Sequence, residues 1–253
     1  MPRDWDARTY DRVADPMTRW GSTVLDRLPL RGDERVLDAG CGSGRVTEQL
    51  AERLPDGRVI ALDGSPSMVG AARERLARFG DRVEYAVADL GAPLPIDGEV
   101  DAVLSTATFH WVADHDVLFA NLATVTRPGG WLVAQCGGEG NIASIQRVLA
   151  TIGDGWLGPV HFETVPATTR RLDASGYVDI ECWLSAEPTR FEAGEPFETY
   201  LRTVVLGAHL ERLTPDEHDP FVAAVAAGVG EPLIDYVRLN IVARRADRDD
   251  RPT

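Results

Sequence analysis

The sequence reads Val36-Leu37-Asp38-Ala39-Gly40-Cys41-Gly42-Ser43-Gly44 where an apolar run meets an acid and then three glycines at alternate positions. A helical spacing of apolar residues begins directly afterwards, at Arg45. We interpret this stretch as a strand that turns sharply into a helix. Because glycine leaves the backbone of such a turn bare, a ligand can lie directly against it.

Strand and helix patterns alternate after this turn. Further strands are expected at 58–62, 83–88, 100–106, 131–136, 177–184 and 236–244. Helices are expected after Gly44, from Pro66 to about Phe79, and at 116–126, 197–210 and 220–227. Strands and helices at this spacing form right-handed βαβ crossovers. We therefore predict an α/β fold with a doubly wound, mostly parallel seven-stranded sheet.

The chain divides into an N-terminal segment, a main domain and a tail. Residues 1–30 are expected to be helical, and their apolar side chains either cover the ligand crevice or pack an amphipathic helix on the domain: Trp5, Tyr10, Val13, Met17 and Trp20. Residues 31–245 form the Rossmann-like domain. Helical cap insertions are expected within about 140–232, because the helical material between the last two strands lacks partner strands there. The charged residues 246–253 are expected to be a disordered tail.

Composition narrows the class of partner. The 26 basic and 40 acidic residues give a formal net charge of −14, which disfavours nucleic acid as a partner. Basic residues are adjacent only in two arginine pairs, Arg170-Arg171 and Arg244-Arg245, which are more often solvated surface than a nucleic-acid binding track. No stretch is long and apolar enough to cross a bilayer, and the first residues lack the layout of a signal peptide. The three cysteines are far apart and match neither a disulfide framework nor a metal site, so we expect a cytoplasmic protein without metal.

Acidic residues stand at the ends of three successive expected strands: Asp38, Asp63 and Asp89. Any one of them has a structural interpretation, because Asp often caps helices and forms turns. In an open α/β sheet, ligands bind beyond the carboxyl ends of the strands. Three acids there, beside a glycine-rich turn and the run from Ser105 to Trp111 after the fourth strand, predict a ligand site.

The spacing of the glycines separates two cofactor chemistries. The nicotinamide fingerprint needs its third glycine three residues after the second, whereas Gly44 follows Gly42 by two. Asp38 before the turn would also repel a pyrophosphate. A cation without phosphates fits better, and S-adenosyl-L-methionine is such a ligand. A nicotinamide-dependent oxidoreductase and a catalytically idle cofactor-binding scaffold protein remain the alternatives.

The chain resembles the class I S-adenosylmethionine-dependent methyltransferases over about residues 13–143 and again at the last two strands. Four motifs carry the resemblance, in order and at fitting intervals: Val36 to Gly44, Val59 to Asp63, Ala88-Asp89-Leu90, and Arg127-Pro128-Gly129-Gly130. The resemblance implies a Rossmann-like methyltransferase fold. It also implies that the first motif lies along the methionyl part and ribose of the cofactor. Asp63 would then bind both ribose hydroxyls, and Asp89 with Leu90 would contact adenine.

A closer similarity is to the trans-aconitate methyltransferase branch and its relatives that methylate small carboxylic acids. It is carried by three short stretches: Trp5-Asp6-Ala7-Arg8-Thr9-Tyr10, Phe109-His110-Trp111-Val112 and Gly137-Gly138-Glu139-Gly140-Asn141. The resemblance implies methyl transfer to a small-molecule acceptor, most simply O-methylation of a carboxylic acid or hydroxyl. A tricarboxylate would want arginines in the pocket, for which the candidates by region are Arg170, Arg171, Arg190, Arg202 and Arg212.

Together these arguments give a set of expected site residues. The cofactor-binding set is Asp38, Gly40, Cys41, Gly42, Gly44, Asp63, Gly64, Met68, Asp89, Leu90 and Ser105. The expected catalytic residues are His110 and Trp111. A carboxylate nucleophile needs no base at neutral pH, so His110 either orients the acceptor or serves as a base for a less acidic one. The sequence leaves open whether the protein is a monomer or a homodimer.

Overall fold

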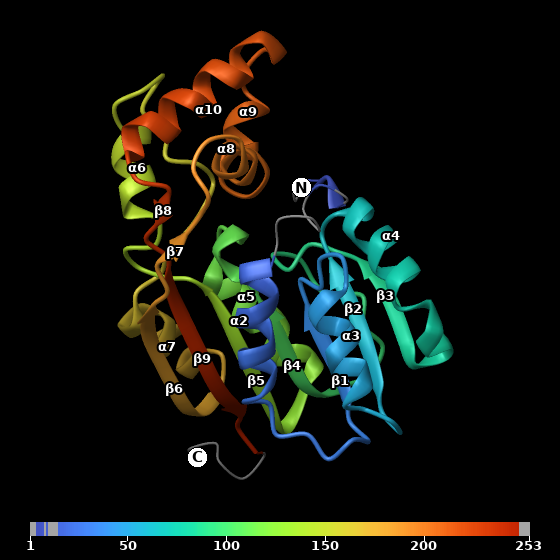
Figure 1. Ribbon diagram of the computed structural model, residues 1–253. Helices are drawn as coiled ribbons and strands as arrows, with labels where there is room; N and C mark the ends of the chain where they lie inside the picture. Colours follow the sequence, from blue (N-terminus) through green and yellow to red (C-terminus); the bar gives the residue numbers. More distant parts are fainter. Residues whose placement is uncertain (1–3, 8, 10–14, 248–253) are drawn as a thin grey trace.

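A single twisted sheet forms the centre of the protein (Figure 1). The computed structural model describes residues 4–7, 9 and 15–247. Tyr10, Val13 and most of the expected tail lie outside these residues. The sheet has seven strands in the order β3-β2-β1-β4-β5-β9-β6. Their bounds are β1 Arg35–Ala39, β2 Arg58–Asp63, β3 Val83–Val87, β4 Val100–Thr106, β5 Thr126–Gly137, β6 Tyr177–Ala186 and β9 Val237–Arg245.

Strand directions confirm the predicted fold class. Strands β1 to β5 pair in parallel throughout, whereas β9 pairs antiparallel with both β5 and β6. Because β9 runs the other way, its first residues lie beside the carboxyl end of β5, where Gly137 is the partner of Arg238. The start of the last strand therefore belongs to the edge of the sheet at which ligands are expected.

Helices cover both faces of the sheet. On one face α2 (Asp15–Leu25), α3 (Arg45–Glu52) and α4 (Pro66–Arg75) pack their apolar residues against β1 to β4, and the short helix η1 (Ala77–Arg82) leads on into β3. On the other face lie α5 (His115–Val125) and α7 (Val165–Ala174). Alternate residues of each buried strand face the two layers, so that Val36 joins one core cluster and Leu37 the other.

A helical cap with its own core stands above the carboxyl edge of the sheet (Figure 1). It consists of α6 (Ala143–Leu149), α8 (Glu195–Tyr200), the π-helical turn η3 (Leu201–Val205), α9 (Gly207–Leu210) and α10 (Pro215–Val229). One feature of this region was not expected from the sequence. A two-stranded ribbon, β7 (Thr189–Arg190) with β8 (Leu233–Ile234), joins the cap to the sheet. Residues 165–186 form α7 and β6 of the main layer, and β6 is the strand expected at 177–184.

The last cap helix begins five residues before the predicted start at Pro220. Thr214 and Glu217 form a capping box, and Pro215 occupies the first turn, where its missing N–H costs nothing. Pro220 then lies inside the helix. The true start is marked by the two residues of the capping box, which stand three positions apart in the sequence.

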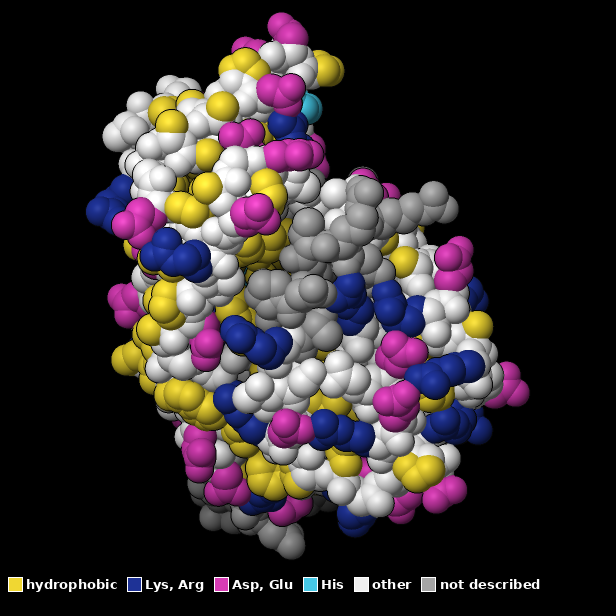
Figure 2. Space-filling view, in the orientation of Figure 1, with side chains coloured by type: hydrophobic (Ala, Val, Ile, Leu, Met, Phe, Trp, Pro, Cys, Tyr) yellow, Lys and Arg dark blue, Asp and Glu magenta, His cyan; other side chains and the backbone are white. Residues whose placement is uncertain are grey.

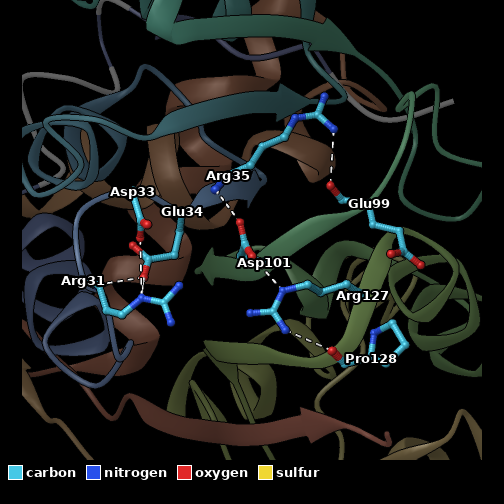
Figure 3. A network of polar contacts seen from close by, with 8 residues as sticks. All are labelled: Arg31, Asp33, Glu34, Arg35, Glu99, Asp101, Arg127 and Pro128. Atoms are coloured by element: carbon cyan, nitrogen blue, oxygen red, sulfur yellow. Dashed lines mark hydrogen bonds and ion pairs between the residues drawn. The ribbon is translucent and has the colours of Figure 1, made fainter. Parts of the chain in front are cut away.

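A polar network fixes the opposite, amino edge of the sheet (Figure 3). The carboxylate of Asp101 on β4 accepts hydrogen bonds from the backbone N–H of Arg35 at 2.8 Å and from Nε of Arg127 at 2.6 Å. Burial alone would raise the pKa of Asp101, but these two donors bring it below its usual value. Through Arg127, the Arg127-Pro128-Gly129-Gly130 motif thus helps to link β1, β4 and β5 at the edge opposite the carboxyl ends of the parallel strands.

The surface of the molecule carries both signs of charge. On the described part of the face in Figure 2, arginine side chains alternate with Asp and Glu, without a continuous basic track. Within the described ranges, no helix is long and apolar enough to span a membrane.

Candidate active site

A cavity of about 770 Å³ lies between the carboxyl edge of the sheet and the cap. Its wall includes the ends of β1, β2 and β4, the start of β9, the first turn of α4, and cap residues of α6, η3 and α9. Such a volume suits a nucleoside cofactor together with a small acceptor. Nine of the thirteen residues expected to form the site line it: Gly40, Gly42, Asp63, Gly64, Met68, Asp89, Leu90, His110 and Trp111.

The glycine turn forms one wall, and its glycines serve different purposes. The backbone N–H groups of Gly40 and Cys41 both donate to the carbonyl of Leu62, which ties the turn to β2. Gly40 has φ +90°, and a Cβ there would lie 2.1 Å from Oγ1 of Thr108. A Cβ on Gly42, at φ +53°, would meet nothing within 4 Å, because this residue borders open space. The turn therefore presents bare backbone to the cavity.

Asp63 lies at the end of β2, and backbone N–H groups fix the orientation of its carboxylate. Oδ2 accepts the N–H of Gly42 at 2.9 Å, and Oδ1 accepts the N–H of Ser65 at 2.8 Å. Burial raises the pKa of Asp63, and the backbone donors oppose that rise. An ionised carboxylate has about four lone-pair sites. The backbone donors use part of this capacity, and the rest is left for donors in the cavity.

Four of the expected residues lie behind the wall rather than in it: Asp38, Cys41, Gly44 and Ser105. A Cβ on Gly44 would lie 3.2 Å from Ala72, so this glycine lets α3 and α4 approach each other. Ser105 donates its hydroxyl to the carbonyl of Ala39 at 2.6 Å and thereby joins β4 to β1. These residues shape the turn, whereas the exposed carboxylate of Asp89 reaches the cavity directly and accepts the N–H of Gly91.

Asp38 is buried beneath the turn, with 1% of its surface exposed. Its Oδ2 accepts the hydroxyl of Thr47 at 2.7 Å, and its Oδ1 has no partner in the described structure. Burial raises the pKa of Asp38 to about 7, against the lowering effect of Thr47 and with a further rise from Asp63. A cation bound above the turn would favour the ionised form of this carboxyl.

His110 and Trp111 come from a short 3-10 turn, η2 (Phe109–Trp111), directly after β4. Nδ1 of His110 accepts the backbone N–H of Gly137 at 3.3 Å. Burial lowers the pKa of His110 well below its usual value, and the positive charge of Arg238 lowers it further. Trp111 and Phe162 flank the imidazole at 5.2 and 5.9 Å between ring centroids.

Part of the N-terminal segment reaches the cavity. Trp5 lines it, and its ring meets that of Trp111 edge to face at 5.3 Å. Ser67 in the first turn of α4 donates to the carbonyl of Trp5 at 2.6 Å, and the hydroxyl of Ser65 contacts the Asp4 carboxylate. Met17 also lines the cavity, whereas Trp20 packs into the core of the cap. Two described apolar residues of this segment thus lie at the cavity, and a third lies in the cap core.

The sequence prediction missed the cavity's most buried cation. Arg238, with 2% of its surface exposed, is the second residue of β9 and lines the cavity. Of the five arginines proposed by region, Arg212 alone lines the cavity, paired with Asp154 at 2.6 Å and stacked on Trp156. One signal in the sequence could have identified Arg238, namely its place in the largely apolar strand from Val237 to Ile241. A buried arginine in such a strand has to face a polar site, because burial without a polar partner costs desolvation free energy.

No grouping of three His, Cys, Asp or Glu side chains that could hold a metal ion occurs among the described residues.

Comparison with known proteins gives consistent matches. Residues 36–130 match the family model of a methyltransferase domain. A trans-aconitate 2-methyltransferase of Azoarcus sp. (strain BH72) is 33% identical over 95% of this chain and 99% of its own length. That of Methylobacterium radiotolerans is 29% identical over 96% and 99%. A Haemonchus contortus phosphoethanolamine N-methyltransferase 2, solved with S-adenosylhomocysteine, has a TM-score of 0.63 at 20% identity, over 96% of this chain and 57% of that one.

Proposed function

Since the chain belongs to the class I S-adenosylmethionine-dependent methyltransferase family and transfers a methyl group from S-adenosyl-L-methionine to a small molecule, we propose that its acceptor is a small carboxylic acid. The names of the full-length relatives support trans-aconitate as the first acid to test. The observation that carries the proposal is the chemistry of the cavity wall. Along the sheet edge, Asp63 and Asp89 stand at one end of this wall, and the buried guanidinium of Arg238 stands at the other.

The residues around the glycine turn and the ends of β2 and β3 fit the cofactor. The turn at Gly40 and Gly42 offers bare backbone, and the carboxyl groups of Asp63 in the wall and Asp38 beneath the turn would suit a ligand that carries a sulfonium and an ammonium group. Asp63 would hold the ribose hydroxyls with its remaining acceptor capacity. Asp89, with the apolar side chains of Met68 and Leu90, would hold the adenine.

The protein's own part in the reaction is alignment and the exclusion of water. When bound, the cofactor supplies a methyl group on sulfonium; a carboxylate oxygen forms the new O–C bond while the C–S electron pair returns to sulfur. A carboxylate is already ionised at neutral pH, so no base is required. Apolar side chains that line the cavity would close the space around the acceptor, among them Trp111, Phe162 and Leu149.

The remaining expectations belong to the same proposal. A small-molecule acceptor, rather than nucleic acid, agrees with the net charge of −14 and with the alternating charges of the described surface. Three cysteines without disulfides suit a cytoplasmic setting. Size-exclusion chromatography with light scattering would distinguish a monomer from a homodimer.

Calorimetry and product analysis test the proposed function. We expect S-adenosylhomocysteine to bind the purified protein, and we expect mass spectrometry to detect a monomethyl ester after incubation with S-adenosyl-L-methionine and trans-aconitate. Absence of S-adenosylhomocysteine binding would contradict the cofactor site. Binding without ester formation from any acid of a panel of mono-, di- and tricarboxylates would contradict the acceptor class.

A further inference from the structure

The charged side chains that the strands bring to the cavity are sorted along the sheet, whereas Asp114, Glu211 and Arg212 line it from other segments. Asp89 follows β3 and Asp63 ends β2, whereas Arg238 lies on β9, on the far side of β1, β4 and β5. Four strand spacings separate β2 from β9, which is roughly 19 Å at about 4.8 Å per strand. A cationic cofactor at the acidic end leaves the cationic end for the acceptor. The ring of His110, after β4, lies between the two.

The hydrogen bond at Nδ1 defines the state of His110. A ring nitrogen that accepts a hydrogen bond carries no proton, and Nδ1 accepts the N–H of Gly137. The titratable groups that act on the ring are Arg238 on β9 and His115 on α5, and both disfavour a second proton on His110. The neutral ring therefore carries its proton on Nε2. Within the described residues Nε2 has no protein acceptor, so His110 offers a donor to the cavity, and Nδ1 is not available as a base.

A network behind the cavity fixes the orientation of Arg238. Its Nε donates to Oε1 of Gln135 at 3.3 Å, and Nε2 of Gln135 donates to Oδ1 of Asn240 at 2.8 Å. Asn240 in turn donates to the hydroxyl of Ser185 at 3.1 Å. The guanidinium also lies over the ring of Trp20, 4.9 Å from its centroid. A guanidinium oriented in this way presents a planar fork, which matches a carboxylate.

We propose that Arg238 and the Nε2–H of His110 bind a carboxylate of the acceptor other than the one that is methylated, and that Gln135 positions Arg238. The inference rests on the proposed function and deepens it to acids with at least two carboxylates. A guanidinium or N–H bonded to the attacking oxygen would withdraw its lone pairs and slow the transfer. The pair is therefore best used on a second carboxylate, which anchors the acid while the first one faces the methyl group.

Binding measurements test this assignment. We would titrate trans-aconitate, and crotonate as a matched acid with one carboxylate, into the wild-type complex with S-adenosylhomocysteine. We expect trans-aconitate to bind at least 10-fold more tightly than crotonate. Arg238→Met should weaken trans-aconitate binding roughly 10- to 150-fold, while its affinity for S-adenosylhomocysteine stays within about twofold of wild type. Arg190→Met, which removes an exposed arginine paired with Glu231, is the matched control and should change neither affinity.

A second variant and a spectroscopic readout cover the case in which Arg238→Met fails to fold. His110→Gln keeps an N–H donor near the position of Nε2 and should retain most trans-aconitate affinity, whereas His110→Phe should lose it about 10-fold. In wild-type protein, nitrogen-15 chemical shifts of His110 should report the neutral Nε2–H form between pH 6 and 8.

Failure of the inference can be distinguished from failure of the proposed function. Loss of S-adenosylhomocysteine binding in the wild type contradicts the function itself. Intact cofactor binding with equal affinities for trans-aconitate and crotonate, or with an unaffected Arg238→Met variant, overturns the inference alone. A proton on Nδ1 of His110, or a complex with S-adenosylhomocysteine that binds no trans-aconitate, overturns it as well.

Discussion

Replacement of Asp63 by asparagine tests the cofactor site most directly. Each carboxylate oxygen now accepts one backbone N–H, from Gly42 and from Ser65. Asparagine keeps one oxygen and turns an amino group toward the other donor, which leaves that N–H without a partner. An unsatisfied buried donor costs about 1–3 kcal/mol of stability. We expect Asp63→Asn to lower the free energy of unfolding by about this amount in urea denaturation.

The effect on the cofactor should come in addition to the loss of stability. Hydrogen bonds to a charged group contribute about 1.5–3 kcal/mol, so S-adenosylhomocysteine should bind roughly 10- to 150-fold more weakly to Asp63→Asn. A cycle with the 2′,3′-dideoxy analogue of S-adenosylhomocysteine isolates the ribose contact. In the wild type, removal of the hydroxyls should cost a similar factor, whereas in the variant it should cost little. Isothermal titration calorimetry measures all four affinities.

Asp101→Asn provides the matched control. Asp101 also accepts two donors, one of them a backbone N–H, but it lies at the amino edge of the sheet (Figure 3). This variant should lose comparable stability and keep wild-type affinity for S-adenosylhomocysteine. If both variants weaken the cofactor equally, the effect is one of stability. If the dideoxy analogue loses as much affinity in Asp63→Asn as in the wild type, Asp63 does not bind the ribose, and our reasoning fails.

Three further predictions follow from the same wall. Because its pKa is raised from 3.8 to about 7, Asp38 favours the folded state at low pH, and this contribution is lost as pH rises through 7. The unfolding free energy of Asp38→Asn relative to wild type should therefore grow by up to about 1.4 kcal/mol per pH unit between pH 4 and 7. A constant difference would contradict the raised pKa. Gly40→Ala should destabilise by about 2 kcal/mol or more in urea, since φ is +90° and Thr108 is too close, and a loss below about 0.5 kcal/mol would refute this. Trp5→Ala removes the ring contact with Trp111, worth about 0.5–1.5 kcal/mol, and should weaken S-adenosylhomocysteine about 2- to 12-fold in calorimetry with little change in melting temperature; unchanged affinity would exclude Trp5 from the site.

The sheet could be predicted from the sequence because its signals are local. Buried parallel strands form continuous apolar runs, so β2 was placed to within one residue and β4 without error. The glycine turn was recognised from spacing alone, because φ values of +90°, +53° and +85° at Gly40, Gly42 and Gly44 leave few other residue types possible.

The acceptor side could not be predicted in the same way, because it depends on contacts between distant segments. Nothing near Arg238 in the sequence indicates that β9 enters the sheet beside the carboxyl end of β5, yet that register brings the arginine into the cavity. Likewise, the state of His110 depends on an N–H from Gly137, 27 residues away. The burial of Asp38 beneath its own turn, with one oxygen unpartnered, also follows from packing rather than from pattern.

The place of β9 between β5 and β6 has a consequence for synthesis on the ribosome. Strand β6 is synthesised well before β9, yet in the described structure β9 is its partner in the sheet. Cys182 of β6, for example, lies opposite Ile241 of β9. A nascent chain that has emerged only as far as the cap has β1 to β5 available to pair, and β6 has to wait. Because Arg238 arrives on the same late strand, the enzyme would complete its sheet and its acceptor site in one final step. A chain cut off before residue 237 would then be both unfinished and unable to select its substrate.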